Sequence, residues 1–363
     1  MVKRRQHSAP GDKSPGLVAA AGGRTISVIM PAYNAAQLLS RTLTPILEML
    51  NNGEISEVLV VDDRSTDDTA QRAAEMGAQV LVTPVNGGPG AARNLASQQA
   101  RGDILWFIDS DVIVHRGAAA HVVAAFADPA IGAVFGSYDD APADPHWFSR
   151  YKNLMHRYYH QEAGNDATTF WAGCGAVRRD VFNQVGGFDI ESYPYPSIED
   201  IELGYRIVSA GYQIRIDPDM LGKHLKAWRI PNAVFTDIFR RALPWSRLMI
   251  AREGVNNDLN TGLAERLKAG IALILLLSLV ALPFNPSLWP LVGIALVSAV
   301  VANLKFARFL YAQGGARLAV PAVLYHQLYF VYAAAVFCWC LFEFHVLGQR
   351  NFVKAKTTGA PEP

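Results

Sequence analysis

The sequence has few cysteines and little net charge, and both features exclude classes of protein. Three cysteines occur in 363 residues: Cys174, Cys338 and Cys340. The last two lie two positions apart in an expected helix, so their side chains point to different faces, and free buried thiols are the expected state. A secreted domain held together by disulfides is therefore excluded. The formal net charge of +1 gives no reason to expect a nucleic-acid partner.

Several familiar sequence signals are also absent. No G-x-G-x-x-G follows the first expected strand and no G-x-x-x-x-G-K-[ST] occurs anywhere, which argues against a dinucleotide-binding Rossmann domain and a P-loop NTPase. Residues 1–24 are basic and rich in Pro, Gly and Ser, without an apolar stretch of signal-peptide length. We expect a disordered tail there. The globular part should accordingly remain in the cytoplasm.

Charge is missing from two long stretches near the C-terminus. No charged residue occurs from Ala269 to Leu304, and Leu318–Phe342 contains only the titratable His326. A membrane-spanning helix needs about 20 apolar residues, whereas a buried helix of a soluble protein rarely runs so long without charge. Residues 266–348 therefore predict about three transmembrane helices, at Ile271–Pro283 with its flanks, Leu288–Leu304 and Val320–Phe342.

These segments predict a multi-pass protein of the inner membrane with its globular part, residues 25–230, in the cytoplasm. The first span would leave the cytoplasm and the second would return to Lys305, Arg308 and Arg317, as the positive-inside rule prefers. A third crossing would place the basic tail, residues 349–363, outside, which the same rule disfavours. The sequence therefore leaves open whether the last segment crosses fully.

The segment before these stretches, residues 231–265, interleaves apolar and aromatic side chains with Arg240, Arg241, Arg247 and Arg252. This pattern is typical of a helix that lies in the membrane interface. An ordinary amphipathic helix on the surface of the enzyme is the alternative. Pro244 is expected to divide the segment in two.

Residues 25–230 alternate short β-rich runs with helical stretches. Strands are expected at 25–31, 57–61, 78–83 and 103–108, and helices at 36–50, 67–76 and 90–100. Near-continuous apolar strands alternating with helices indicate an α/β fold with a mostly parallel sheet covered on both faces. Ligands bind at the carboxyl ends of such strands. Polar or turn-forming residues fall there: Pro31, Tyr33, Asn34, Asp62, Asp63, Asp109 and Asp111.

Two of these residues, Asp109 and Asp111, end the apolar run WFIDSDV one residue apart. Like charges this close hinder each other's ionisation unless a cation lies between them. In an extended strand both side chains would face one side. A solvated turn is the alternative, but the other polar clusters at the same edge favour a site. The glycine-rich stretch Asn86–Gly90 and Arg93 could bind an anionic group or simply cap a helix.

Six motifs in series resemble one enzyme family. SVIMPAYN (27–34), VVDDRSTDDT (60–69), GPGAARNLA (88–96) and FIDSDV (107–112) are similar to the nucleotide-sugar half of an inverting family 2 glycosyltransferase with the GT-A fold. FWAGCGAVRRDVFNQVGGFD (170–189) and EDIELGYRIVSAGY (199–212) resemble the acceptor half of that family. The resemblance covers roughly residues 25–230, and it is specific because the motifs occur together.

The resemblance implies a nucleotide site and a metal site. It places Tyr33 against the base of a UDP- or GDP-linked sugar and makes Asp63 accept a hydrogen bond from it. Asp63 could instead be a turn residue, and His224 could be a surface histidine beside Lys223 and Lys226. The implied nucleotide-binding residues are Pro31, Tyr33, Asn34, Asp63, Arg93 and Asp109, and the implied ligands of Mn²⁺ or Mg²⁺ are Asp111, Asp109 and His224.

The resemblance also implies catalysis by Asp200, as the general base, with Glu199 beside it. Capping of the helix that starts there is the alternative. A base suits a hydroxyl acceptor, because a phosphate acceptor is already ionised. We therefore expect a glycosyltransferase acting on a lipid-linked or membrane-associated hydroxyl, with a polyprenyl-phosphate transferase or a non-catalytic scaffold as alternatives. RRALPW (240–245) lacks the glutamine of the Q-x-x-R-W motif, which disfavours a processive synthase.

Overall fold

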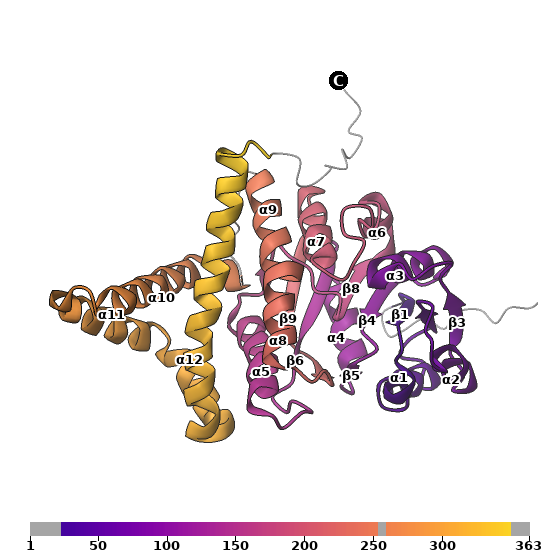
Figure 1. Cartoon of the computed structure of the whole chain (residues 1–363). Helices are drawn as coiled ribbons and strands as arrows, with labels where there is room; N and C mark the ends of the chain where they lie inside the picture. Colours follow the sequence, from indigo (N-terminus) through magenta and orange to yellow (C-terminus); the bar gives the residue numbers. More distant parts are fainter. Residues whose placement is uncertain (1–22, 253–258, 350–363) are drawn as a thin grey trace, which may run out of the picture.

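The computed structural model describes residues 23–252 and 259–349 and shows an α/β domain followed by C-terminal helices (Figure 1). The described strands form one sheet in the order β3-β2-β1-β4-β8-β6-β9-β5, with β7 paired to β9. The strands are β1 (Ile26–Ala32), β2 (Glu57–Asp62), β3 (Gln79–Val82), β4 (Ile104–Ile108), β5 (Val112–Val114), β6 (Ile131–Tyr138), β7 (Asp166–Ala167), β8 (Cys174–Arg178) and β9 (Gln213–His224).

Helices cover both faces of this sheet because its strands are apolar on both sides. Helices α1 (Ala36–Asn51), α2 (Thr69–Glu75) and α4 (Ala118–Ala125) pack on one face. Helices α3 (Gly88–Gln99), α6 (Arg179–Gln184) and α7 (Glu199–Ser209) pack on the other. The predicted strands and helices of the first hundred residues are all present, within one or two residues at most ends. The predicted α/β fold is confirmed.

The sheet is parallel in its first half and mixed in its second. Strands β1, β2, β3 and β4 pair in parallel, whereas β8 runs antiparallel to both β4 and β6. Along β4, Ile104, Trp106 and Ile108 face α1, and Phe107 faces α3 and α7. Asp109 follows Phe107 by two positions, so its side chain leaves the sheet on the same side, towards α3 and α7.

The segment between the domain and the C-terminal helices is helical. It contains α8 (Ile230–Phe235), the π-helical turn η1 (Thr236–Ala242) and α9 (Leu243–Ala251), and it lies between α7 and α12 (Figure 1). Pro244 stands at the second position of α9, where its missing amide proton costs no hydrogen bond. The predicted division at this proline is not observed, because the backbone remains helical through Ala242 and Leu243 and only the helix type changes there. Helix α5 (Trp147–Glu162) packs against the same C-terminal helices.

The three predicted membrane segments form helices of unequal length: α10 (Leu263–Ala281), α11 (Trp289–Ala302) and α12 (Leu304–His345). By length and composition, only α12 among the described helices could cross a membrane. Of the three predicted spans, only the last, which lies in α12, is supported by the described structure. The predicted tails lie almost wholly outside the described residues, as do residues 253–258 of the predicted interfacial segment.

Helix α12 is itself broken at a pair of glycines. Gly314 and Gly315 have non-helical backbone angles, with φ of 62° at Gly315. The rings of Phe306 and His326 lie 4.7 Å apart, although a continuous helix would separate these positions by about 30 Å. The chain therefore folds back at the glycines, and the uninterrupted helix runs from residue 316 to residue 345.

Replacing Gly204 of α7 with alanine tests the packing that holds this helix on the sheet. A Cβ at Gly204 would lie 2.4 Å from the amide nitrogen of Phe170, a backbone atom that cannot move freely. We expect Gly204→Ala to lower the free energy of unfolding by roughly 1–3 kcal/mol, measured by denaturant unfolding. Gly270→Ala in α10 is the matched control, because a Cβ there meets nothing within 4 Å. Equal stability of both variants would contradict this close packing.

Candidate active site

The segment after β4 is a tight turn that sends its two aspartates to different partners. The amide of Val112 donates to the carbonyl oxygen of Asp109 (3.0 Å). The expectation that Asp109 and Asp111 share one face of an extended chain is therefore wrong. The chain turns because β5 leaves β4 and pairs with β9 at the edge of the sheet. Both side chains remain accessible, 35% for Asp109 and 29% for Asp111.

Arg93 of α3 is the counter-ion of Asp109. Its guanidinium donates to Oδ1 of Asp109 (2.5 Å) and lies 3.7 Å from Oε1 of Glu199, the first residue of α7. The Arg93 side chain is only 4% exposed, and its guanidinium carbon lies 5.4 Å from the ring centre of Phe188. One buried cation therefore joins the aspartate after β4 to the first glutamate of α7.

Asp111 lies beside His224, the last residue of β9. Because Val112 pairs with His224 in the ladder between β5 and β9, Oδ2 of Asp111 comes within 3.3 Å of Nε2 of His224. The other ring nitrogen, Nδ1, lies 2.6 Å from Oδ1 of Asn153 on α5. An amide oxygen only accepts hydrogen bonds, so Nδ1 carries a proton and Nε2 faces Asp111. The His224 side chain is 8% exposed, so the alternative of a surface histidine is wrong.

Asp111 and His224 have the donor chemistry of a site for a divalent metal. A metal-binding histidine is held by a hydrogen bond to its second nitrogen, as Asn153 provides here. Within residues 23–252 and 259–349, no three His, Cys, Asp or Glu side chains gather closely enough to hold a metal by themselves. Diphosphate oxygens and water would have to complete the coordination, as Mg²⁺ commonly requires.

Burial and neighbouring charge act differently on the two aspartates. Burial raises the pKa of Asp109, and repulsion from Asp111 adds to this, while Arg93 opposes both. Burial would also raise the pKa of Asp111, but the hydrogen bond and charge of His224 lower it overall. Asp111 is therefore anionic beside the histidine, whereas the ionisation of Asp109 depends on Arg93.

The loop before β8 ties Asp200 to the same place. The carbonyl oxygen of Gly173 accepts from the amide of Asp109 (3.1 Å), and the amide of Ala172 donates to Oδ2 of Asp200 (3.2 Å). This loop can approach α7 closely because Gly204 has no side chain. Asp200 is thereby held at the first turn of α7, and its carboxylate adds to the repulsion felt by Asp109.

The two acids at the start of α7 both hold protons more tightly than usual. Burial raises the pKa of Glu199, repulsion from Asp200 adds to it, and the pKa reaches about 7. Burial also raises the pKa of Asp200, against the amide of Ala172 and the charges of Arg93 and Arg241. Arg241 belongs to η1, so its exposed guanidinium reaches this part of the site from outside the α/β domain.

The residues predicted at the end of β1 lie at the same edge of the sheet. Pro31 is buried in β1, and Tyr33 is 52% exposed. Asn34 has a left-handed backbone, with φ of 51°. Its side-chain oxygen accepts from the amide of Thr66 (2.8 Å), which joins the loops after β1 and β2. The aromatic ring of Tyr33 is therefore free to contact a ligand, while Asn34 has a role in holding the loop.

Asp63 is buried and already organises the glycine-rich loop. It accepts from the hydroxyl of Thr83 (2.7 Å) and from the amides of Gly87 (3.0 Å) and Gly88 (2.7 Å). A carboxylate offers about four acceptor positions, so one remains for a ligand. Asp62 accepts from the amide of Ser65 and is a turn residue.

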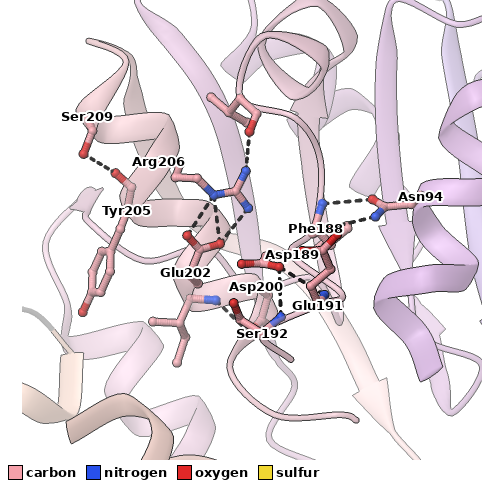
Figure 2. Close-up of polar contacts among 12 residues, drawn as sticks. Asn94, Phe188, Asp189, Glu191, Ser192, Asp200, Glu202, Tyr205, Arg206 and Ser209 are labelled. Carbon is pink, nitrogen blue, oxygen red and sulfur yellow. Dashed lines mark hydrogen bonds and ion pairs between the residues drawn. The ribbon is translucent and has the colours of Figure 1, made fainter. Parts of the chain in front are cut away.

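A second network fixes the loop around Phe188 against α3 (Figure 2). Asn94 both donates to the carbonyl of Phe188 (2.8 Å) and accepts from its amide (2.9 Å). Asp189 accepts from two amides of the following turn. On α7, Arg206 donates to Glu202 (2.7 Å), four residues before it, and to a backbone carbonyl. These residues support the site without lining it.

The sequence reasoning missed Asn153 and gave Arg241 only an interfacial role. Asn153 lies on a helix more than seventy residues before His224, and no motif marks it. Arg241 was read as part of an amphipathic segment, although a π-helical turn is a frequent mark of a functional site. Neither role could be inferred without the position of η1 and α5 relative to α7 and β9.

Residues 27–186 match the family model described as glycosyl transferase family 2. A glucosyl-3-phosphoglycerate synthase of Mycolicibacterium paratuberculosis is 38% identical over 118 residues, 30% of this chain and 35% of that protein. The pre-mycofactocin glycosyltransferase of Mycobacterium tuberculosis is 28% identical over 215 residues, 55% of this chain and 43% of that protein. The chain thus spans half or less of the length of these two curated relatives.

A solved structure shares the fold over most of the chain. It is described as the mannosyltransferase PcManGT from Pyrobaculum calidifontis in complex with GDP-Man and Mn²⁺. The TM-score is 0.53 with 24% sequence identity, and the match covers 90% of this chain and 91% of that chain. At this identity the likeness shows the fold alone. It agrees with the predicted GT-A fold.

The raised pKa of Glu199 predicts a loss of stability as the pH rises. The folded protein binds this proton up to about pH 7, whereas an unfolded glutamate releases it near pH 4.5, so stability falls between these values. Between pH 4.5 and pH 8 the free energy of unfolding should fall by roughly 2–3 kcal/mol more in the wild type than in Glu199→Gln. Unfolding of both proteins at the two pH values measures this difference. Exposed Glu75→Gln is the control. Identical pH profiles for wild type and Glu199→Gln would refute the buried titration.

Proposed function

Because residues 27–186 form a glycosyltransferase family 2 domain, we propose that the chain is an inverting glycosyltransferase. It moves a sugar from a nucleotide-sugar donor to a hydroxyl of a lipid-linked or membrane-associated acceptor. One observation carries the proposal: Arg93 bridges Asp109 to Glu199, so that the end of β4 and the start of α7 meet at one edge of the sheet. A donor and an acceptor can be held side by side there.

The nucleotide part of the donor is assigned to the ends of β1, β2 and β4. Tyr33 offers an exposed ring for stacking on a base, and the remaining acceptor position of Asp63 suits a ring N–H of uracil or guanine. The solved Pyrobaculum structure holds GDP-Man, which supports a nucleotide sugar and leaves UDP and GDP as the candidates. Pro31, Asn34, Arg93 and Asp109 complete the proposed nucleotide site.

Asp111 and His224 are the proposed protein ligands of a divalent metal, with Asp109 beside them. The Pyrobaculum structure contains Mn²⁺, and a carboxylate with an imidazole nitrogen suits Mn²⁺ as well as Mg²⁺. A bound divalent metal stabilises the charge that develops on the departing diphosphate. The protein's own contribution is to aim Nε2 of His224 at this position through the hydrogen bond from Nδ1 to Asn153.

Asp200 is the proposed general base. It removes the proton of the acceptor hydroxyl, and the oxygen then attacks the anomeric carbon as the bond to the diphosphate breaks. The nucleoside diphosphate leaves with the bonding electron pair, and the proton stays on the Asp200 carboxylate. Burial raises the pKa of Asp200, which makes this carboxylate a better proton acceptor. Glu199 holds Arg93 in place and takes no proton in this scheme.

A phosphate acceptor is the second candidate, and Arg241 favours it. Its charge acts on Asp200 from η1, at the side of the site that faces the C-terminal helices. A guanidinium there suits the phosphate of a polyprenyl phosphate. A non-catalytic scaffold is disfavoured, because the nucleotide, metal and base positions are all filled by residues of the right chemistry.

Asp200→Asn separates these candidates. For a hydroxyl acceptor we expect kcat to fall by about 10²–10⁴, measured as nucleoside diphosphate released by purified protein in the presence of lipid extract. Binding of the donor should be unchanged. Exposed Asp219→Asn is the control. Full activity of Asp200→Asn would rule out the base and favour a phosphate acceptor, and no release from any UDP- or GDP-sugar by the wild type would favour the scaffold.

Asn153→Leu tests how His224 is held. Without the amide oxygen the ring loses its fixed orientation, so we expect the affinity for Mn²⁺ to fall about 10–100-fold. Electron paramagnetic resonance of free Mn²⁺, recorded with nucleoside diphosphate present, measures this directly and needs no turnover. Asn183→Leu, an exposed asparagine on another helix, is the matched control. An unchanged Mn²⁺ affinity in Asn153→Leu would remove Asn153 from the site.

A further inference from the structure

The stretch of the C-terminal helices between Glu265 and Glu343 carries positive charge without negative charge. Between Glu265 and Glu343 the sequence contains no aspartate or glutamate but five basic residues: Arg266, Lys268, Lys305, Arg308 and Arg317. Lys268 is paired with Glu265 and Lys305 with Glu162, and Arg266, Arg308 and Arg317 are exposed. Such a surface is complementary to anionic lipid headgroups. The same region carries most of the large apolar side chains that the described structure leaves exposed.

Helices α10 and α11 form a hairpin that leaves many of its large apolar side chains exposed. The hairpin projects away from the sheet, crosswise to α12 (Figure 1). Leu277 of α10 is 58% exposed and Ile294 of α11 is 66% exposed. At the turn, Phe284 is 87% exposed and Trp289 is 70% exposed. At 1.5 Å per residue, α10 is about 28 Å long and α11 about 21 Å, whereas the hydrocarbon core is about 30 Å thick. Helix α11 is therefore too short to cross it.

Helix α12 is held along the α/β domain from one end of its long segment to the other. Tyr151 of α5 bonds to His326 (2.8 Å), and Tyr332 donates to Asp237 of η1 (2.8 Å). Near its end, Arg247 of α9 pairs with Glu343 (2.9 Å). From His326 to Glu343 a helix rises about 25 Å, close to the depth of a bilayer core. If α12 crossed a membrane, it would draw α5, η1 and α9 into the hydrocarbon with their buried charges.

The opposite face of α12 is an uninterrupted apolar stripe. The exposed residues Val320, Leu324, Leu328, Trp339 and Phe342 recur at intervals that place them on one side of a helix. Their neighbours Ala322, Tyr325 and Cys340 are buried against the protein. The long helix is therefore apolar on both sides. One face packs on the domain, and the side chains of the opposite stripe are left exposed in the described part of the chain.

We propose that this region binds one leaflet of an anionic bilayer without crossing it. Helix α12 lies in the plane of the membrane with its apolar stripe against the lipid. The hairpin of α10 and α11 enters the hydrocarbon from the same side and returns, and the exposed cations contact the headgroups at its base. The turn near Ser287 ends inside the bilayer, and Leu347, just after α12, stays on the side of the α/β domain. This inference does not depend on the transfer reaction.

Vesicle flotation tests the surface itself. The full chain, released from detergent, should float with vesicles that contain phosphatidylglycerol and bind less to pure phosphatidylcholine. We expect each of Arg308→Gln and Arg317→Gln to weaken partitioning about fivefold. Leu277→Glu with Ile294→Glu should abolish flotation, while Val82→Glu, an exposed apolar residue of the α/β domain, should not. A protein that stays in solution as a dimer and does not float would show that a second copy covers this face, and would overturn the proposal.

Site-specific labelling tests the topology. In a background with the three cysteines replaced by serine, Ser287→Cys and Leu347→Cys are inserted into vesicles from outside and exposed to a membrane-impermeant maleimide on either side. We expect Leu347→Cys to react only from outside and Ser287→Cys to react from neither side. Labelling of Leu347→Cys from the lumen would show that α12 crosses, and lumenal labelling of Ser287→Cys would show that the hairpin crosses. Either result overturns the proposal.

Discussion

The site depends on one buried cation, Arg93. The partly buried Asp109 and Asp200 come together with the buried Glu199, and their mutual repulsion must be offset for the two halves of the domain to meet. Arg93 bonds to Asp109 and attracts Glu199, so that the same side chain holds β4 and α7 together. The compensation is incomplete, because the pKa values of all three acids stay raised. The edge of the sheet is thus prepared for a further positive charge.

Much of this arrangement could be predicted from the sequence, because it rests on local patterns. Apolar strands ending in polar residues located the edge of the sheet, and the aspartates and Arg93 were found there. The geometry at Asp109 and Asp111 could not be predicted, since it depends on β5 pairing with β9, more than a hundred residues later. Asn153 could not be predicted either, because its contact with His224 joins residues that are 71 positions apart in the sequence. Composition located the C-terminal helices, yet it does not show that α11 is only 14 residues long or that Gly314 and Gly315 reverse the chain before the last segment.

Helix α5 connects the two parts of the molecule through neighbouring residues. Asn153 holds His224 in the site, and Lys152, the residue before it, is buried in an ion pair with Asp237 of η1 (2.8 Å). Tyr159 on the same helix donates to Glu265 at the base of the hairpin (2.7 Å). A helix is rigid over so few residues, so the position of η1 and the orientation of His224 are set by one element.

The layer formed by η1 and α9 separates α12 from α7, and it is a single helix thick (Figure 1). Trp245 of α9 donates to Tyr205 of α7 (2.9 Å), and Arg247 of α9 reaches Glu343 of α12. Neighbouring helices pack about 8–10 Å apart. With lipid against the outer face of α12, this layer becomes a spacer of fixed height. In the proposed reaction it sets the reach required of the acceptor, whose reactive oxygen would lie about two helix diameters beyond the headgroups, at Asp200.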